Sequence, residues 1–565
     1  MQEQVFIGGG NVDYAVPQYL KLKYANRHGL IAGATGTGKT VTLQIMAEEF
    51  SKAGVPVFLS DVKGDLSGLA KSGSATHKLH EAFQSRAETI GFSDYVYQSF
   101  PCVFWDLFGE AGHPIRTTIA EMGPLLLSQL LELSEAQEGI LNIAFRLADE
   151  QGLALLDIKD IQSLLVWLGE NRQELSLRYG NISVQSIGAI QRRLLVLENQ
   201  GAAKIFGEPA LDLTDMIATD PAGLGRINIL AADRLMAAPR LYASFLLWLL
   251  SELFETLPEV GDPDKPKLVF FFDEAHLLFE DAPKALVDKV EQVARLIRSK
   301  GVGVYFVTQN PADVPEDILG QLGNRVQHAL RAYTAKDRKA LRLAAETYRE
   351  NPRFSVEEAI LQVGVGEAVT FFLEKKGVPG VVERTLIRPP SSHLGAIAPA
   401  ERQKVIEGSP LHGKYETPID RRSAYEVLQA RAIAAVEDAE KVEKYLEDER
   451  PEVRDFNAGR RYSGLRVDRA HARPSARQDS FGQALSQAFV KELKGATGRS
   501  IYVWRSGKLF QRALRTLPPF EPRQHCRKIF ALAVFDFDEL CIKVLGHFSH
   551  WRVSIDHFRG LLAEA

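Results

Sequence analysis

One short stretch of the chain has the residue types and spacing of a phosphate-binding loop. It reads GATGTGKT, from Gly33 to Thr40, and fits the pattern Gly-x-x-x-x-Gly-Lys-Thr. Glycines let the backbone approach an anion closely, so that N–H groups of the loop and of the following helix point at the α- and β-phosphates. Lys39 would reach the β- and γ-phosphates, and the Thr40 hydroxyl would ligate Mg²⁺. An apolar run precedes the motif and a helical pattern follows it, so the stretch predicts binding of a nucleoside triphosphate. The residues expected to contact the nucleotide are Gly33, Ala34, Thr35, Gly36, Thr37, Gly38, Lys39, Thr40 and Val41.

An acidic pair ends a second apolar run. The residues from Leu268 to His276 read LVFFFDEAH, so Asp273 and Glu274 directly follow a buried strand. Ligands of parallel sheets bind at the carboxyl ends of the strands, which is where both carboxylates would lie. Asp273 would hold Mg²⁺ through water, and Glu274 would accept a proton from a water that attacks the γ-phosphate. Water as the acceptor predicts hydrolysis. The alternative is a solvated acidic pair at the start of a helix.

A polar strand end and two arginines complete the candidate site. The run GVGVYFVTQN contains Thr308 and Gln309, and Gln309 could orient the attacking water or sense the γ-phosphate. Its alternative role is to cap the following turn. Arg325 and Arg331 come next, in GQLGNRVQHALRAYT, and either could reach the γ-phosphate of a neighbouring subunit and stabilise charge in the transition state. The alternative for both arginines is an exposed side chain or an ion pair.

A set of apolar runs predicts the sheet that positions these residues. They read HGLIAG, VPVFLSD, GRINILAA, KLVFFFDE, GVGVYFVTQ and EAVTFFL. Uninterrupted apolar runs are typical of parallel strands covered on both faces, and the helical pattern after the phosphate loop joins the first two runs as a βαβ unit. The sequence therefore predicts an α/β fold built on a parallel sheet.

The pattern changes along the chain and suggests several parts. From about residue 112 to 221 strand signals are nearly absent, which indicates a helical insertion. A charged helix expected over 421–450 carries a narrow apolar stripe from Leu428 to Leu446, and would either dock on its own ATPase domain or form an intermolecular coiled coil. The expected parts are the first part of the ATPase core with the phosphate loop (1–110), the helical insertion (111–221), the second part of the core (222–390), a linker and C-terminal helix (391–450), a flexible tail (451–500) and a tail of unassigned role (501–565).

Composition and net charge indicate which broad class of protein the chain belongs to. The chain has 565 residues, a net charge of −4, 45% hydrophobic and 25% charged residues, as expected of a globular protein with several domains. Without an overall positive charge, contact with nucleic acid would need a local basic surface. Arg295, Arg298 and Lys300 form one basic cluster, which could contact phosphates or simply be the solvated end of a helix.

Cysteine usage and apolar segments point to a reducing cytoplasm. The three cysteines, Cys102, Cys526 and Cys541, fit neither a disulfide framework nor a zinc motif. The start, MQEQVFIGGG, lacks the profile of a signal peptide. The most apolar helical stretch, Leu241 to Phe254, is shorter than the roughly 20 residues that a membrane span needs, and it contains Glu252. We expect this stretch to be a buried core helix and the protein to be cytoplasmic, with no membrane partner.

Taken together, these motifs resemble the HerA/FtsK branch of P-loop motor ATPases. The segments that carry the resemblance are GATGTGKT, VFFFDEAH, VTQNP and NRVQHALR. More closely, NRHGLIAGATGTGKTVTLQ and SDVKGDLSGLA are similar to the bacterial HerA-like P-loop ATPase family, over roughly residues 5–390. The resemblance implies a RecA-like core of the type with an additional strand and a catalytic glutamate. It also implies assembly into a ring, usually a hexamer, hydrolysis of ATP with Mg²⁺ at subunit interfaces, and translocation of double-stranded DNA.

The resemblance also implies a role for individual residues. Lys39 and Thr40 would bind phosphate and Mg²⁺, with Asp273 as the second Mg²⁺ residue. Glu274 would be the general base and Gln309 the sensor. Arg325 is the preferred candidate for the arginine finger and Arg331 the second. Asp61, Lys63 and Asp65, in DVKGDL, match a segment near the active site, where the two aspartates would support the site or form a plain turn at a strand end.

Two departures from the family pattern bear on the function. HerA proteins usually carry an N-terminal β-barrel, whereas the strand before the phosphate loop begins here at about residue 28, and the helical region 112–221 is a candidate replacement. The leading hypothesis is a ring-forming ATPase motor that acts on DNA as a translocase or helicase-like enzyme, with a nuclease or another protein as a further partner. The alternative is a regulatory or scaffold ATPase that does not translocate DNA. A small-molecule kinase is disfavoured by the acidic pair and by the size of the chain.

Overall fold

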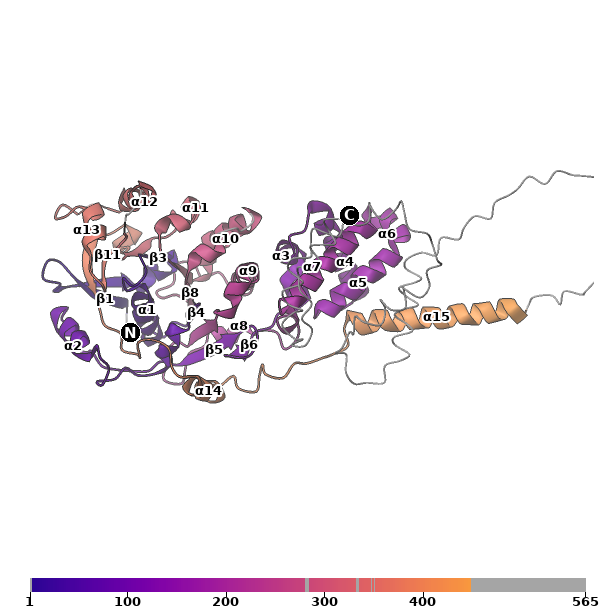
Figure 1. Cartoon of the computed structure of the whole chain (residues 1–565), viewed down its shortest axis with the longest axis horizontal. Coiled ribbons are helices and arrows are strands. Elements are labelled where there is room, and N and C mark those ends of the chain that lie inside the picture. The colour runs from indigo at the N-terminus through magenta and orange to yellow at the C-terminus, as the bar shows by residue number, and fades with distance from the viewer. Residues whose placement is uncertain (1–2, 280–283, 332–334, 347, 350, 449–565) are drawn as a thin grey trace, which may run out of the picture. The chain divides into compact units, whose positions relative to one another are not determined.

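The computed structural model describes residues 3–279, 284–331, 335–346, 348–349 and 351–448. These residues contain a twelve-stranded sheet that carries the candidate site (Figure 1). In sheet order the strands are β2 (Val16–Lys21), β1 (Gln4–Gly10), β12 (Glu383–Ile387), β11 (Glu367–Phe371), β10 (Asn324–Gln327), β3 (Gly29–Ala32), β9 (Val302–Thr308), β8 (Leu268–Phe272), β4 (Val57–Asp61), β7 (Ile227–Ala231), β5 (Cys102–Asp106) and β6 (His113–Pro114).

The central strands are parallel, as the sequence predicts. β10, β3, β9, β8, β4, β7, β5 and β6 pair in parallel with their neighbours in that order. β9 lies between the strand before the phosphate loop, β3, and the strand before the acidic pair, β8. This is the additional strand that the resemblance implies. Ala32 pairs with Thr308 and Phe272 with Phe306, so the ends of these strands meet at one edge of the sheet.

Burial on both faces explains the uninterrupted apolar runs. Along β8, Phe270 and Phe272 pack into one hydrophobic core, whereas Val269 and Phe271 pack into the core on the other face. Because side chains alternate between the faces of a strand, a strand covered on both sides needs apolar residues at every position. The strands that hold the site are therefore buried between two hydrophobic cores, one on each face of the sheet.

The strands beyond β10 depart from the prediction. The run EAVTFFL forms β11, which pairs antiparallel with β10 and with β12 and is not part of the parallel sheet. β12 in turn pairs antiparallel with β1, and β1 with β2. Parallel neighbours need a long crossover connection, usually a helix, whereas antiparallel neighbours do not. The segment between β11 and β12 is short, which fits their antiparallel pairing.

The helices fall into those that cover the sheet and those of the helical region. α3 contacts α4, and α5 contacts α4, α6 and α7, so the region expected to be a helical insertion is a packed group of helices. Its buried side chains belong to the same hydrophobic core as one face of the sheet. In chain order the helices are α1 (Lys39–Lys52), α2 (His80–Thr89), α3 (Ile119–Leu130), α4 (Glu135–Gln151), α5 (Ile158–Glu170), α6 (Arg172–Tyr179), α7 (Val184–Asn199), α8 (Leu213–Met216), α9 (Pro239–Thr256), α10 (Lys284–Ile297), α11 (Glu316–Leu319), α12 (Ala335–Glu346), α13 (Val356–Gln362), α14 (Pro399–Glu407) and α15 (Ala424–Asp448).

α9 holds the most apolar helical stretch of the sequence. Its side chains from Leu241 to Leu250 are almost entirely buried, and Trp248 and Tyr242 are among the largest side chains of the core. The prediction of a buried core helix is confirmed. Within the described residues, every helix is too short or too polar to cross a bilayer.

The chain that follows β12 is tied to the helix of the phosphate loop. The Arg388 guanidinium donates a hydrogen bond of 2.8 Å to Glu48 of α1, and both side chains have no exposed surface. Glu48 also accepts hydrogen bonds from the backbone N–H groups of Ser391 and Ser392. Further along, the backbone N–H of Ile397 donates to Ser67 Oγ in the 3₁₀ helix η2 (Asp65–Ala70). Residues 391–420, expected to be a linker, thus begin with fixed contacts and then form α14.

α15 lies where the charged helix is expected. It contacts α5, and Asp160 of α5 accepts a hydrogen bond of 2.8 Å from the backbone N–H of Tyr425. Leu428 is buried at this contact, whereas Val442, further along the expected stripe, is 57% exposed. The start of the helix is therefore docked on the helical region. The tails expected over 451–500 and 501–565, with Cys526 and Cys541, lie outside the described residues.

Candidate active site

The phosphate loop connects β3 to α1. Gly33 and Gly38 have φ values of 154° and 116°, which L-residues with side chains rarely adopt. A Cβ atom on Gly33 would lie 2.5 Å from the Cβ of His328, so this position admits only glycine. At Gly38 the neighbour is the backbone of Gly366, 3.3 Å from the place of a Cβ. The backbone is thus bent so that the N-terminus of α1 opens at the edge of the sheet, where an anion would bind.

Lys39 is folded over this loop. Its ammonium donates hydrogen bonds to the carbonyl oxygens of Gly33, at 2.6 Å, and Ala34, at 3.2 Å. Burial lowers the pKa of Lys39, and the charges of Glu274 and Asp273 partly oppose that shift. The acidic pair therefore acts on the phosphate-loop lysine across the site. Thr40 follows at the start of α1 and is half-buried.

The acidic pair lies at the end of β8. Asp273 is buried, and its backbone N–H donates to Ser60 Oγ at 3.2 Å. Ser60 in turn accepts a hydrogen bond of 2.8 Å from the Tyr242 hydroxyl of α9. Burial, together with the neighbouring charge of Glu274, raises the pKa of Asp273 to about 7. A cation at this carboxylate would offset both effects.

Glu274 has an unusual backbone and two engaged carboxylate oxygens. Its φ of 48° and ψ of 50° are left-handed, a conformation that persists in a glutamate only where surrounding contacts hold it. Oε1 accepts a hydrogen bond of 2.6 Å from Lys63 Nζ, and Oε2 lies 3.4 Å from Gln309 Nε2. Burial alone would raise the pKa of Glu274, but the hydrogen bond and charge of Lys63, together with Gln309 and His276, hold the pKa below its usual value.

Lys63 lies in the DVKGDL segment, which the resemblance places near the active site without a role for this lysine. It lies in the loop after β4, and that loop is fixed by Asp61, whose carboxylate accepts the backbone N–H groups of Gly64 at 2.8 Å and Leu66 at 3.2 Å. Burial, with the nearby charge of Asp65, raises the pKa of Asp61 to about 7. Asp61 thus supports the loop, and Lys63 contacts the site directly.

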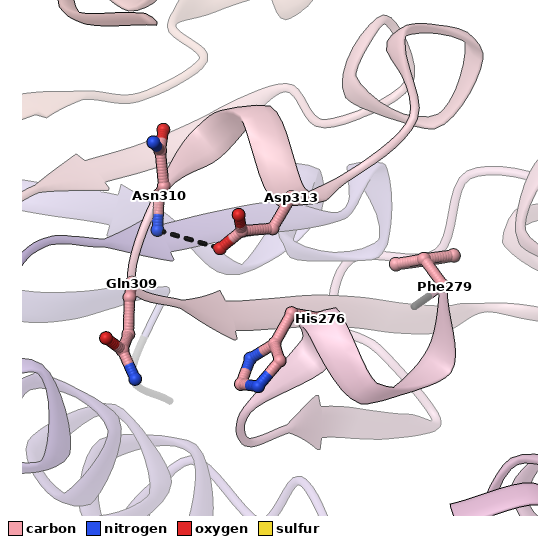
Figure 2. Close-up of a pocket in the computed structure, with 5 residues that line it drawn as sticks. All are labelled: His276, Phe279, Gln309, Asn310 and Asp313. Atoms are coloured by element: carbon pink, nitrogen blue, oxygen red, sulfur yellow. Dashed lines mark hydrogen bonds between the residues drawn. The ribbon is translucent and has the colours of Figure 1, made fainter. Parts of the chain in front are cut away.

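Gln309 follows β9 and borders a cavity of about 530 Å³. Figure 2 shows Gln309 and His276 directed toward the same space from the segments after β9 and β8. His276 Nδ1 lies 3.5 Å from Glu274 Oε2. Asp313 accepts the backbone N–H of Asn310 at 3.0 Å and so fixes the turn that follows Gln309. The remaining lining residue is Phe279.

The two candidate arginines differ in their surroundings. Arg325, on β10, donates hydrogen bonds to the carbonyl oxygens of Leu322 at 3.1 Å and Leu319 at 2.9 Å, and its guanidinium lies over the ring of Tyr348, 6.0 Å from the ring centre. Burial lowers the pKa of Arg325, and its guanidinium is held by its own subunit. Arg331 is exposed. The preference for Arg325 as a residue that reaches a neighbour therefore finds no support in its contacts, and Arg331 is the accessible candidate.

The basic cluster at the end of α10 and just after it is engaged in contacts within the chain. Arg298 pairs with Asp262 at 3.3 Å, and Arg295 pairs with Glu291. Lys300 lies over the ring of Phe254. These contacts favour the interpretation of the cluster as the end of a helix.

Comparison with known proteins places the chain in a family. The family described as helicase HerA-like C-terminal matches residues 10–512. The chain belongs to the HerA-like family. It is 22% identical over 368 residues to the DNA double-strand break repair helicase HerA of Sulfolobus acidocaldarius, covering 64% of each chain. To the protein of the same name from Sulfurisphaera tokodaii it is 21% identical over 360 residues, covering 62% of this chain and 63% of that one.

The match thus spans less than two thirds of the length of these HerA-like relatives. Among solved structures, the bacterial conjugative coupling protein TrwBdeltaN70 is similar, with 15% sequence identity and a TM-score of 0.44. That similarity covers 68% of this chain and 91% of TrwBdeltaN70.

Proposed function

We propose that the protein is an ATP-hydrolysing motor of the HerA type, which forms a ring and translocates on DNA. The observation that carries this proposal is the position of Glu274. Its carboxylate lies at the end of β8, which β9 separates from β3 and the phosphate loop, and it contacts Gln309, the residue that follows β9. A buried carboxylate, a phosphate loop and a polar sensor at one sheet edge are what hydrolysis of a triphosphate requires.

The residues at this edge fit a nucleotide with Mg²⁺. Mg²⁺ takes oxygen ligands and is usually held by one or two protein side chains together with phosphates and water. The Thr40 hydroxyl and the Asp273 carboxylate supply such oxygens, and the buried carboxylate would be stabilised by a cation. Mg²⁺ would neutralise charge on the phosphates. Lys39 and the N-terminus of α1 would bind the β- and γ-phosphates.

The chemistry assigned to this chain is attack of water on the γ-phosphorus. A bond forms between the water oxygen and phosphorus, the bond to the bridging β,γ-oxygen breaks, and ADP and phosphate leave. Glu274 accepts the proton of the attacking water, while Gln309 orients that water. A low pKa makes Glu274 an anion at neutral pH, which is the form that accepts a proton.

The proposed action on DNA and assembly into a ring are inferred from membership of the HerA-like family. The two archaeal relatives are named DNA double-strand break repair helicases. We extend to this chain assembly into a ring, with a hexamer as the expected size, and action on duplex DNA. An arginine from the neighbouring subunit would complete the site, and Arg331 is accessible for that role.

A single set of measurements tests the proposal. Phosphate release from ATP is measured with and without duplex DNA at several salt concentrations, and particle mass is measured in the same mixtures. A motor hydrolyses faster with DNA, loses the stimulation as salt rises, and has the mass of a ring. Turnover that DNA does not change, in a particle of any size, would favour the regulatory or scaffold ATPase instead.

A further inference from the structure

Lys63 is exposed, unlike the other charged side chains that face it, those of Lys39, Asp273 and Glu274. Its side chain is 49% exposed, whereas the side chain of its partner Glu274 is 7% exposed. The loop that carries Lys63 is fixed at its base by Asp61, and β4 pairs directly with β8, so the Cα of Lys63 stays beside the end of β8. A lysine side chain has four flexible methylene groups, and half of this one is already in water. The ammonium can therefore change partners while its backbone stays in place.

Two lysines face the same pair of carboxylates. The charges of Glu274 and Asp273 act on both Lys63 and Lys39, and the two ammonium groups also repel each other. Such a balance of charges changes when a phosphate arrives, because the γ-phosphate brings more negative charge than one carboxylate. Lys63 is the more exposed of the two lysines, so it is the one that responds to the phosphate.

We propose that Lys63 senses the γ-phosphate and positions the general base: without a triphosphate it holds Glu274 Oε1, and with ATP it moves to the γ-phosphate and leaves that oxygen to the attacking water. This inference rests on the proposed ATP hydrolysis and identifies how the same site distinguishes ATP from ADP. A carboxylate oxygen that already accepts a charged hydrogen bond is a poor base, since proton transfer to it must compete with the ammonium. ADP lacks the γ-phosphate, so Lys63 stays with Glu274.

A double-mutant cycle on nucleotide affinity tests this exchange without requiring hydrolysis. The four proteins are the unaltered chain, Lys63→Ala, Glu274→Gln and the double variant, and the ligands are a non-hydrolysable ATP analogue and ADP. In the unaltered background, Glu274→Gln removes the partner that competes for Lys63, so the analogue binds more tightly. In the Lys63→Ala background only the loss of carboxylate–phosphate repulsion remains.

The expected result is an effect of Glu274→Gln on analogue affinity that is about tenfold larger with Lys63 present, with ADP affinity changed by less than about twofold throughout. Lys63→Ala alone should reduce the preference for the analogue over ADP by about tenfold, and Lys63→Arg should restore part of it. A merely structural role of Lys63 would weaken both nucleotides alike. Lys159→Ala is the matched control, because Lys159 is 55% exposed and pairs with Asp157 at 3.3 Å in the helical region.

Two results would overturn the inference. One is an equal effect of Glu274→Gln in both backgrounds, and the other is an unchanged preference for the analogue over ADP in Lys63→Ala. Binding of no nucleotide by the unaltered chain is a different outcome, since it removes the proposed hydrolysis itself and the role of Lys63 with it. Thermal unfolding of each variant, together with the Lys63→Arg protein, separates a loss of folding from a loss of sensing.

Discussion

His328 and Thr42 are joined by a buried hydrogen bond of 2.8 Å between Nε2 and Oγ1. The other ring nitrogen lies 2.9 Å from the carbonyl oxygen of Glu367. A carbonyl only accepts, so Nδ1 carries the proton and Nε2 accepts from the threonine hydroxyl. The neutral imidazole thus links the end of β10 to the helix α1 just behind the phosphate loop.

This contact predicts a loss of stability in mild acid. Burial lowers the pKa of His328 to about 4, against about 6.5 in the unfolded chain. Between these values the unfolded chain binds a proton that the folded one does not, so the free energy of unfolding falls as the pH drops below 6.5. The loss from His328 alone should be about 2 kcal/mol at pH 5. Urea unfolding of the unaltered chain and of His328→Gln at pH 7 and pH 5 measures it, and an identical pH dependence in both would contradict the assignment.

Glu274→Gln should bind ATP and lose turnover. The amide keeps the shape of the side chain but cannot accept the proton of the attacking water, so kcat should fall by about 10²- to 10⁴-fold. Nucleotide binding is followed by fluorescence titration and turnover by phosphate release. Normal turnover in this variant would remove Glu274 from the role of general base.

Arg388→Met should destabilise the protein strongly. It leaves the carboxylate of Glu48 buried without its guanidinium partner, a change that typically costs about 3–5 kcal/mol. Lys71→Met is the matched control, because Lys71 pairs with Glu401 at 2.7 Å on the surface and such pairs contribute less than about 1 kcal/mol. Chemical denaturation measures both. Equal losses in the two variants would show that burial does not govern the contribution of Arg388.

The two arginines should behave differently on replacement by alanine. Arg325→Ala removes the guanidinium that donates to the carbonyl oxygens of Leu319 and Leu322 and should cost about 1–3 kcal/mol of stability. Arg331→Ala should keep its stability and lose turnover. Mixing Arg331→Ala with Lys39→Ala should restore part of the activity, because an intact phosphate loop then faces an intact arginine at hybrid interfaces. Turnover that stays absent at every mixing ratio would count against an arginine supplied by the neighbour.

The central strands could be predicted because each is a short apolar run, which burial on both faces demands. β10 could not, because its sequence NRVQ is mostly polar. Asn324 is buried there because its amide donates to the carbonyl oxygens of Tyr24, at 3.0 Å, and His28, at 3.1 Å. A polar strand is stable only when such partners exist, and they come from distant segments that no local pattern reveals. The antiparallel direction of β11 could not be predicted either, because β11 pairs with β10, the strand that the local pattern does not reveal.

The residues of the candidate site likewise fall into two groups: those that a local motif reveals and those that only the tertiary structure brings together. The phosphate loop and the acidic pair are local motifs, so their residue types and order were visible in the sequence. Lys63 lies 211 residues from Glu274, and only the pairing of β4 with β8 brings them together. The accessibility of Arg331 and the fixed position of Arg325 likewise follow from packing around β10. Tertiary contacts, and not residue identity, determine the surroundings of these three residues.

The contacts of Glu48 also bear on where the part of the chain that contains the phosphate loop could be truncated. A chain truncated after residue 390, where the sequence suggests a boundary, retains Arg388 but loses the backbone N–H groups of Ser391 and Ser392 that this carboxylate requires. It would also lose the N–H of Ile397 that is bound to η2. The segment that these contacts tie to α1 and η2 therefore extends past β12 to Ile397, and a truncation that preserves them should end beyond that residue.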